Sequence, residues 1–163
     1  MNIVLATTLI IAVFLKSDWR SWEKYYPEML YIALAASVYE LIAYKEFHLW
    51  EFKETAMLSK FNVHLLHNLV VNPIVVLLYL SNYPTQGKKL FYNLKWIFGF
   101  WVIEWFASIF HVISYHNGWN LILSLLFIMV MFPMIRLHHS NKTLALPLSV
   151  VISITLLLLF GYI

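Results

Sequence analysis

The chain has no cysteine among its 163 residues, and it has only four glycines. Without cysteine it can form no disulfide, no thiolate metal site and no thiol nucleophile. The glycines lie far apart, so the sequence contains neither a Walker loop nor a GxGxxG fingerprint, and nucleotide chemistry is not expected. Functional side chains must therefore be sought among the carboxylates, histidines, amides and hydroxyls.

Charge is scarce as well. Charged residues make up 12% of the chain and hydrophobic residues 62%. In an average soluble domain, about 25% of the residues are charged and about 45–50% are hydrophobic. A soluble domain of this size could not hide so much apolar surface, because small domains keep a large share of their surface in water. The composition therefore predicts an all-α, polytopic membrane helix bundle that forms one transmembrane domain over residues 1–163. Its partner is the lipid bilayer, and nucleic acid is not expected as a partner.

Six apolar segments are candidates for membrane-spanning helices, since a span needs about 20 mostly apolar residues. They cover residues 2–15, 27–44, 61–80, 90–115, 119–135 and 144–163. The first segment would be only about 21 Å long as a helix. The sequence therefore predicts six spans, or five if residues 2–15 rest in the membrane interface.

Lysine and arginine set the expected orientation, because loops rich in these residues stay in the cytoplasm. Eight of them fall on one side of the predicted bundle: Lys16, Arg20, Lys24, Lys88, Lys89, Lys95, Arg136 and Lys142. Only Lys45, Lys53 and Lys60 fall on the other side. This bias places the first, third and fifth loops in the cytoplasm, and with six spans both termini lie outside.

The cytoplasmic connections carry two further patterns. Trp19, Trp22 and Tyr26 follow helical spacing, which predicts an aromatic stripe on a helix that lies in the inner interface. His138 and His139 follow the fifth segment. Two adjacent histidines without other ligands nearby lack the context of a metal site. We therefore expect them to be a solvated pair in a loop.

Ionisable side chains inside membrane spans are costly and normally face the bundle interior or a wet cavity. The candidates are Glu40 on the second segment, His64, His67 and Asn68 on the third, and Glu104, Ser108 and His111 on the fourth. Within the third and fourth segments these residues follow helical spacing and share one face. By helical rise, Glu40, His67 and Glu104 all lie roughly 10 Å below the outer edge of a 30 Å core. This shared depth predicts one outward-facing polar pocket in which His67 faces Glu104.

Three classes of function fit such a pocket. A transporter or ligand-binding component would bind or translocate a small cationic or protonatable ligand through Glu and His, and this class leads. An intramembrane enzyme would hold a divalent metal through His64, His67 and either Glu40 or Glu104, with Glu104 as the named candidate, although no H-E-x-x-H motif is present. A non-catalytic protein would use the same residues as hydrogen bonds between helices and would bind other membrane proteins. Whether the protein is an enzyme stays open.

Three stretches, MLYIALAASVYELIAYKEFHLWEF, YHNGWN and MFPMIRLHH, resemble a family of small, functionally uncharacterised multi-spanning proteins of spore-forming Gram-positive bacteria. The resemblance covers most of the chain. It implies a multi-pass protein of the bacterial cytoplasmic membrane. It implies no activity and assigns no functional residues.

Overall fold

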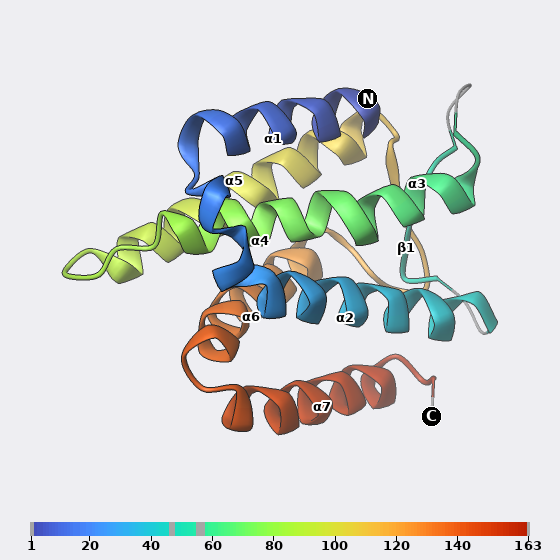
Figure 1. The fold of residues 1–163 in the computed structure, drawn as a ribbon. Helices are drawn as coiled ribbons and strands as arrows, with labels where there is room; N and C mark the ends of the chain where they lie inside the picture. Colours follow the sequence, from blue (N-terminus) through green and yellow to red (C-terminus); the bar gives the residue numbers. More distant parts are fainter. Residues whose placement is uncertain (1, 46–47, 55–57, 163) are drawn as a thin grey trace.

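The computed structural model describes residues 2–45, 48–54 and 58–162 and is helical over most of its length (Figure 1). The helices are α1 (Asn2–Lys16), the 3₁₀-helix η1 (Trp19–Tyr25), α2 (Tyr26–Lys45), α3 (Lys60–Leu66), the π-helix η2 (His67–Val71), α4 (Asn72–Ser81), α5 (Lys89–Ile109), α6 (Leu121–Ser140) and α7 (Lys142–Leu159). Two short strands, β1 (Trp50–Phe52) and β2 (Ile113–Tyr115), pair antiparallel. The all-α class predicted from composition is confirmed.

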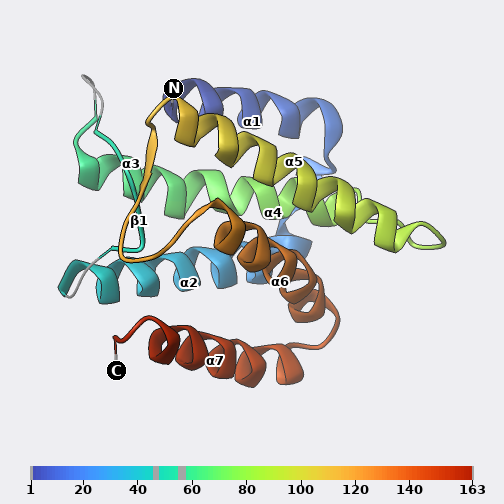
Figure 2. The same ribbon diagram turned by 180° about the vertical axis from the view of Figure 1, so that it is seen from behind.

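Six long helices run alternately back and forth, because α3, η2 and α4 continue one another as a single helix over Lys60–Ser81 (Figures 1 and 2). Both chain termini and the two strands lie at one end of the bundle, which we call the strand end. The opposite end holds η1, the 82–88 connection and the turn between α6 and α7. We call it the basic end, since seven of the eleven lysines and arginines lie in these segments or within five residues of them.

The core lies where α4, α5 and α6 meet. Phe132 of α6 has no exposed surface, and its ring contacts Tyr79 of α4 at 5.0 Å between centroids. Trp96 and Phe100 of α5 each lie 5.8 Å from the same ring. The Tyr79 hydroxyl donates a hydrogen bond to Asn93 of α5 over 2.5 Å. Aromatic packing around Phe132 therefore joins these three helices near the basic end.

Within the described residues, three helices are long and apolar enough to cross a membrane: Lys60–Ser81, α6 and α7. They correspond to the third, fifth and sixth predicted segments. The apolar stretch of α1, Ala6–Lys16, is shorter. Helices α2 and α5 have the length, with 20 and 21 residues, but are less apolar. Length and composition thus support three of the six predicted spans.

The fourth predicted segment ends early. It was expected to stay helical to Tyr115, but α5 ends at Ile109 and residues 113–115 form β2. His111 has a φ of 54°, its N–H bonds the carbonyl of Ser108, and the N–H of Val112 bonds the carbonyl of Ala107. These bonds form a Schellman motif, which satisfies the last helical carbonyls and stops the helix.

The two connections at the strand end hold each other in place. Besides the β1–β2 pairing, the N–H of His116 bonds the carbonyl of Leu49, and the Asn117 side chain donates to the carbonyl of His48. A tight turn follows β2, in which Asn117 and Gly118 both have positive φ. Strand pairing therefore places β1 across the end of the third helix.

Candidate functional site

Glu40 forms the centre of a polar cluster at the strand end. Its Oε1 lies 2.6 Å from Nδ1 of His64 on α3, and its Oε2 lies 3.8 Å from Nε2 of His48 in the connection that follows α2. His64 is buried, whereas Glu40 and His48 are partly exposed. The structure therefore brings together Glu40 and His64, two of the residues predicted to share a pocket.

Phe52 of β1 covers the two histidines of the third helix. Its ring stacks on His67 with centroids 3.9 Å apart and meets His64 edge-on at 5.4 Å. The Nε2 atoms of His64 and His67 are both buried and have no hydrogen-bond partner in the described part of the chain. A buried polar atom left unpaired costs about 1–3 kcal/mol. Two buried imidazole nitrogens are therefore left to a ligand, and one of them belongs to the histidine that contacts Glu40.

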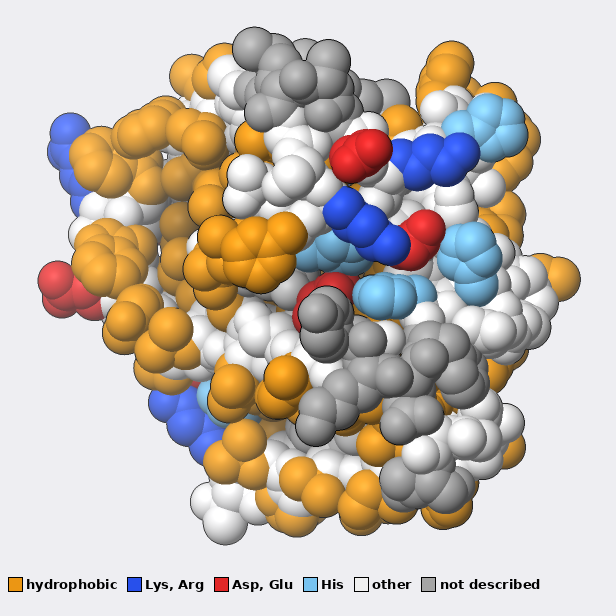
Figure 3. Space-filling view, turned by 90° about the vertical axis from the view of Figure 1, so that its right-hand side faces the viewer, with side chains coloured by type: hydrophobic (Ala, Val, Ile, Leu, Met, Phe, Trp, Pro, Cys, Tyr) orange, Lys and Arg blue, Asp and Glu red, His pale blue; other side chains and the backbone are white. Residues whose placement is uncertain are grey.

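A second carboxylate, Glu51 of β1, lies at the outer side of this cluster. It forms an ion pair with Lys60 at the start of α3, and its Oε1 lies 3.6 Å from Nε2 of His116. The hydrogen bond from Lys60 lowers the pKa of Glu51 below its ordinary value. Burial lowers the pKa of His48. Figure 3 shows acidic, basic and histidine side chains gathered on this end of the molecule.

Five residues of this cluster were not predicted from the sequence to belong to the site: His48, Glu51, Phe52, Lys60 and His116. Within the stretch KEFHLWEFKE, residues Trp50 to Lys53 alternate aromatic and charged side chains, a period of two that is typical of a strand. That alternation was the available signal for β1. It did not identify β2 as the partner strand, because β2 lies in a stretch predicted to be helical.

Glu104 belongs to a different cluster. Its Oε1 accepts a hydrogen bond of 2.8 Å from the Tyr115 hydroxyl of β2. Close by in the chain, the Trp119 indole N–H donates to Ser124 of α6 over 2.8 Å. Helix α5 packs chiefly on α6, so Glu104 lies on that side, whereas His67 packs against Phe52. The structure therefore does not bring Glu104 to Glu40 and His64.

The remaining residues predicted for the pocket lie on different elements and differ in exposure. Asn68 is partly buried on η2, and Ser108 is partly buried in the last turn of α5. His111 is exposed in the Schellman motif and so does not line a pocket with Glu104. Among residues 2–45, 48–54 and 58–162 no three His, Asp or Glu side chains lie close enough together to hold a metal ion. His64, His67 and Glu104 therefore do not form the metal site considered from the sequence.

A buried carboxylate at the basic end holds the two histidines that we expected in a solvated loop. Glu28, in the first turn of α2, is 1% exposed. Its Oε1 lies 3.2 Å from Nδ1 of His138, and its Oε2 lies 3.2 Å from Nδ1 of His139. Lys142 approaches to 3.9 Å. The expectation for His138 was wrong, since this residue is only 6% exposed and lies on α6.

The Glu28 cluster lies between two hollows. His138, which stacks on Tyr31 at 4.2 Å, lines an apolar groove of about 620 Å³ between α2 and α7. His139 lines a cavity of about 300 Å³ that is rich in basic residues. In the sequence, the signal for this cluster was Glu28, a carboxylate beside Pro27 at a predicted helix start. A carboxylate at this place needs a cationic partner, but the sequence does not show which helix carries that partner.

No protein family, no curated protein and no solved structure matches the chain. The family resemblance of the three sequence stretches therefore stays a prediction. Function is inferred below from the two clusters, from the exposed apolar surface and from the distribution of charge. These features belong to the chain itself and need no relative.

Proposed function

We propose that the protein spans a membrane with all six long helices, with the strand end outside and the basic end in the cytoplasm. Large apolar side chains are exposed on every long helix, among them Leu15, Leu34, Phe61, Leu90, Ile122 and Leu159. Soluble monomers rarely expose contiguous apolar surface on this scale, whereas lipid covers it without cost. The excess of Lys and Arg at the basic end supports the orientation.

Labelling of single cysteines tests this placement, since the chain has no cysteine of its own. Lys53 at the strand end and Gln86 at the basic end are both exposed. In intact bacterial cells, a membrane-impermeant maleimide should label the Lys53→Cys variant, and it should label Gln86→Cys only after lysis. Labelling of both variants in intact cells would contradict the proposed topology.

We propose further that the strand-end cluster binds a small protonated amine, as a ligand-binding or transport component of the membrane would. The observation that carries this proposal is the contact between the Glu40 carboxylate and His64, together with the Nε2 atoms of His64 and His67, which are buried and have no partner among the described residues. In His64, Nδ1 lies 2.6 Å from Glu40, and a neutral imidazole with its proton on Nδ1 offers a lone pair at Nε2. An ammonium group supplies both the positive charge for Glu40 and the N–H donors for these lone pairs.

Thermal unfolding of the purified protein with methylammonium, tetramethylammonium or sodium tests this function. Methylammonium should raise the melting temperature most, because tetramethylammonium and sodium have no N–H donor. A ligand present at 100 times its Kd stabilises the folded protein by about 2.7 kcal/mol. The response should be lost in Glu40→Gln, which keeps the shape of the side chain and removes its charge.

The matched control is Glu54→Gln, which removes a charge from an exposed residue of the same connection. It should keep the wild-type response. When His48 is protonated, it competes with the ammonium ligand for the Glu40 carboxylate, so binding should weaken as pH falls. Because burial lowers the pKa of His48, this loss should be centred below about pH 6.5, the ordinary value for histidine. A wild type that no cation stabilises at any pH would favour the purely structural class instead.

A further inference from the structure

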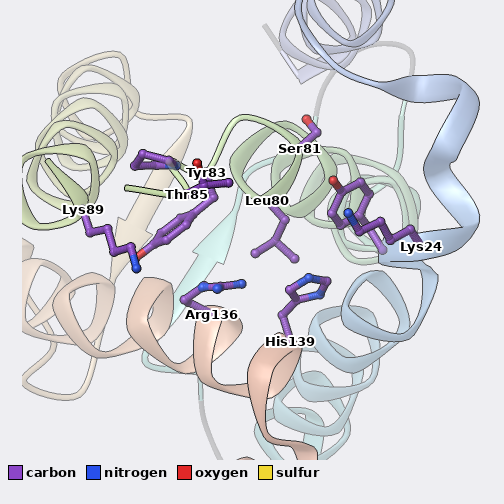
Figure 4. Close-up of a pocket in the computed structure, with 10 residues that line it drawn as sticks. Lys24, Leu80, Ser81, Tyr83, Thr85, Lys89, Arg136 and His139 are labelled. Carbon is purple, nitrogen blue, oxygen red and sulfur yellow. The ribbon is translucent and has the colours of Figure 1, made fainter. Parts of the chain in front are cut away.

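The cavity of about 300 Å³ at the basic end has a strongly one-sided lining (Figure 4). It lies between η1, the end of α4, the start of α5 and the end of α6. Lys24, Lys89, Arg136 and His139 line it, and Ser81, Tyr83 and Thr85 add hydroxyl groups. Among the residues that the structure describes, no carboxylate is part of the lining. The electrostatic character of the cavity therefore selects for an anion.

Arg136 is the residue that most needs an anionic partner. It is partly buried on α6, and its guanidinium lies 4.6 Å from the ring centre of Tyr83. Among the described residues the ion pairs at this end all go to Glu28, from His138, His139 and Lys142, so Arg136 has no carboxylate partner. A guanidinium presents a planar fork of donors that matches the oxygens of a phosphate.

The neighbouring side chains are arranged around the same space. Figure 4 shows Arg136 and His139 side by side on α6, with Lys89 and Lys24 on opposite sides of the cavity. Glu28 holds Nδ1 of His139, which leaves Nε2 as the ring nitrogen available to a ligand. Four groups from three separate segments can thus converge on one anion.

We propose that this cavity binds a phosphate monoester or diester group. A volume of about 300 Å³ corresponds to about ten water molecules. It accommodates a phosphate together with an attached glycerol, and it is larger than a simple inorganic ion needs. Arg136 binds two phosphate oxygens, Lys24 and Lys89 neutralise its charge, and the hydroxyls of the lining complete its hydrogen bonds.

The position of the cavity favours the headgroup of an anionic phospholipid as the source of this phosphate. Trp19, Trp22 and Tyr26, which belong to η1 or adjoin it, are exposed, and such aromatic side chains lie at headgroup level in membrane proteins. Lys24 and Tyr25 of the same segment line the cavity. Basic pockets between helices on the cytoplasmic side are recognised sites for anionic headgroups. This choice of source rests on the membrane placement proposed above, whereas the phosphate site itself does not.

Binding to the full-length chain in a non-ionic detergent tests the proposal. Phosphatidylglycerol should bind more tightly than phosphatidylcholine, as measured by native mass spectrometry over a lipid titration. Arg136→Gln should weaken phosphatidylglycerol binding about tenfold, because it removes charge-assisted hydrogen bonds. Lys89→Gln changes an exposed residue that the fold does not need, and it should weaken binding about threefold. The two variants together separate loss of binding from loss of folding.

The matched control is Lys95→Gln, which removes one positive charge from an exposed position of α5 outside the cavity. It should change binding less than twofold. Equal losses in Lys95→Gln and Arg136→Gln would show attraction by net charge alone and overturn the site, as would equal binding of the two lipids. Glycerol 3-phosphate and inorganic phosphate separate the sources. If either binds with the same dependence on Arg136 as the lipid, the site takes a soluble phosphate, even where cysteine labelling contradicts the membrane placement.

Discussion

Glu28→Ala is expected to lower the free energy of unfolding by about 3–5 kcal/mol, the range seen when one partner of a buried ion pair is removed. Glu28 is 1% exposed, and each of its oxygens lies 3.2 Å from Nδ1 of a histidine of α6. Alanine would leave His138 buried without its partner and would remove the link from α2 to Lys142. Unfolding in mixed micelles of SDS and a mild detergent, followed by circular dichroism, measures this loss.

Two companion variants make the Glu28 measurement specific. Glu23→Ala removes a carboxylate that is exposed on η1 at the same end, and it should change the free energy of unfolding by less than about 0.5 kcal/mol. Glu28→Gln keeps an acceptor oxygen for the histidines, and its loss should lie between those of the two alanine variants. If Glu28→Ala is no more destabilising than Glu23→Ala, the carboxylate of Glu28 is solvated and the buried cluster does not hold the helices together.

Phe132→Ala is expected to cost about 3 kcal/mol, at the lower end of the range for buried phenylalanines. The Phe132 ring has no exposed surface and contacts Tyr79, Trp96 and Phe100 from two other helices. In a membrane the separated helices remain in apolar surroundings, so the hydrophobic transfer contribution is largely absent. What remains is the loss of packing contacts and the cavity that the missing ring leaves.

Phe98 provides the control for Phe132. It lies on α5 and is 63% exposed, so in detergent micelles the detergent already surrounds most of its ring. Phe98→Ala should lower the free energy of unfolding by less than about 1 kcal/mol in the same measurement, because detergent acyl chains fill the space that the ring leaves. Equal losses for the two variants would mean that the aromatic cluster around Phe132 is loosely packed.

Helix positions could be predicted largely from the sequence, because an apolar run of sufficient length is a local property. The third segment was expected over residues 61–80, and the helix covers Lys60–Ser81. The end of α5 could not be predicted in this way. It depends on His111 adopting a left-handed conformation, which glycine favours and which the histidine type does not signal.

The candidate site could be predicted only in part. Helical rise fixes the depth of a side chain, and it placed Glu40 and the third-helix histidines at nearby levels, as the Glu40–His64 contact requires. The helical rise does not determine which neighbouring helix a given face contacts. Glu104 was expected at the same depth, but it bonds Tyr115 of β2 because α5 packs chiefly on α6.

The Glu28 cluster was missed for a related reason. Residues 119–135 were expected to form the fifth span, whereas α6 continues to Ser140 and so carries His138 and His139 on its last turn. The helix stops only at Asn141, whose side chain accepts a hydrogen bond from the N–H of Leu144 and caps α7. The partner of these histidines lies 110 residues earlier in the chain, beyond the reach of any local pattern.

The five residues of η2 wind more widely than the α-helical turns on either side of them. A π-helical turn of this kind accommodates one residue more than α-helical winding would. Because the wide turn absorbs that residue, removing it would restore a uniform helix with little rotation of Lys60–Leu66 relative to α4. His64 would still face Glu40, and Tyr79 and the aromatic core would keep their places. A deletion within the regular turns of Lys60–Leu66 would instead rotate the residues before it by about 100°. In evolutionary terms, the π-helical turn is the place where this helix can gain or lose a single codon and keep its histidine at the carboxylate.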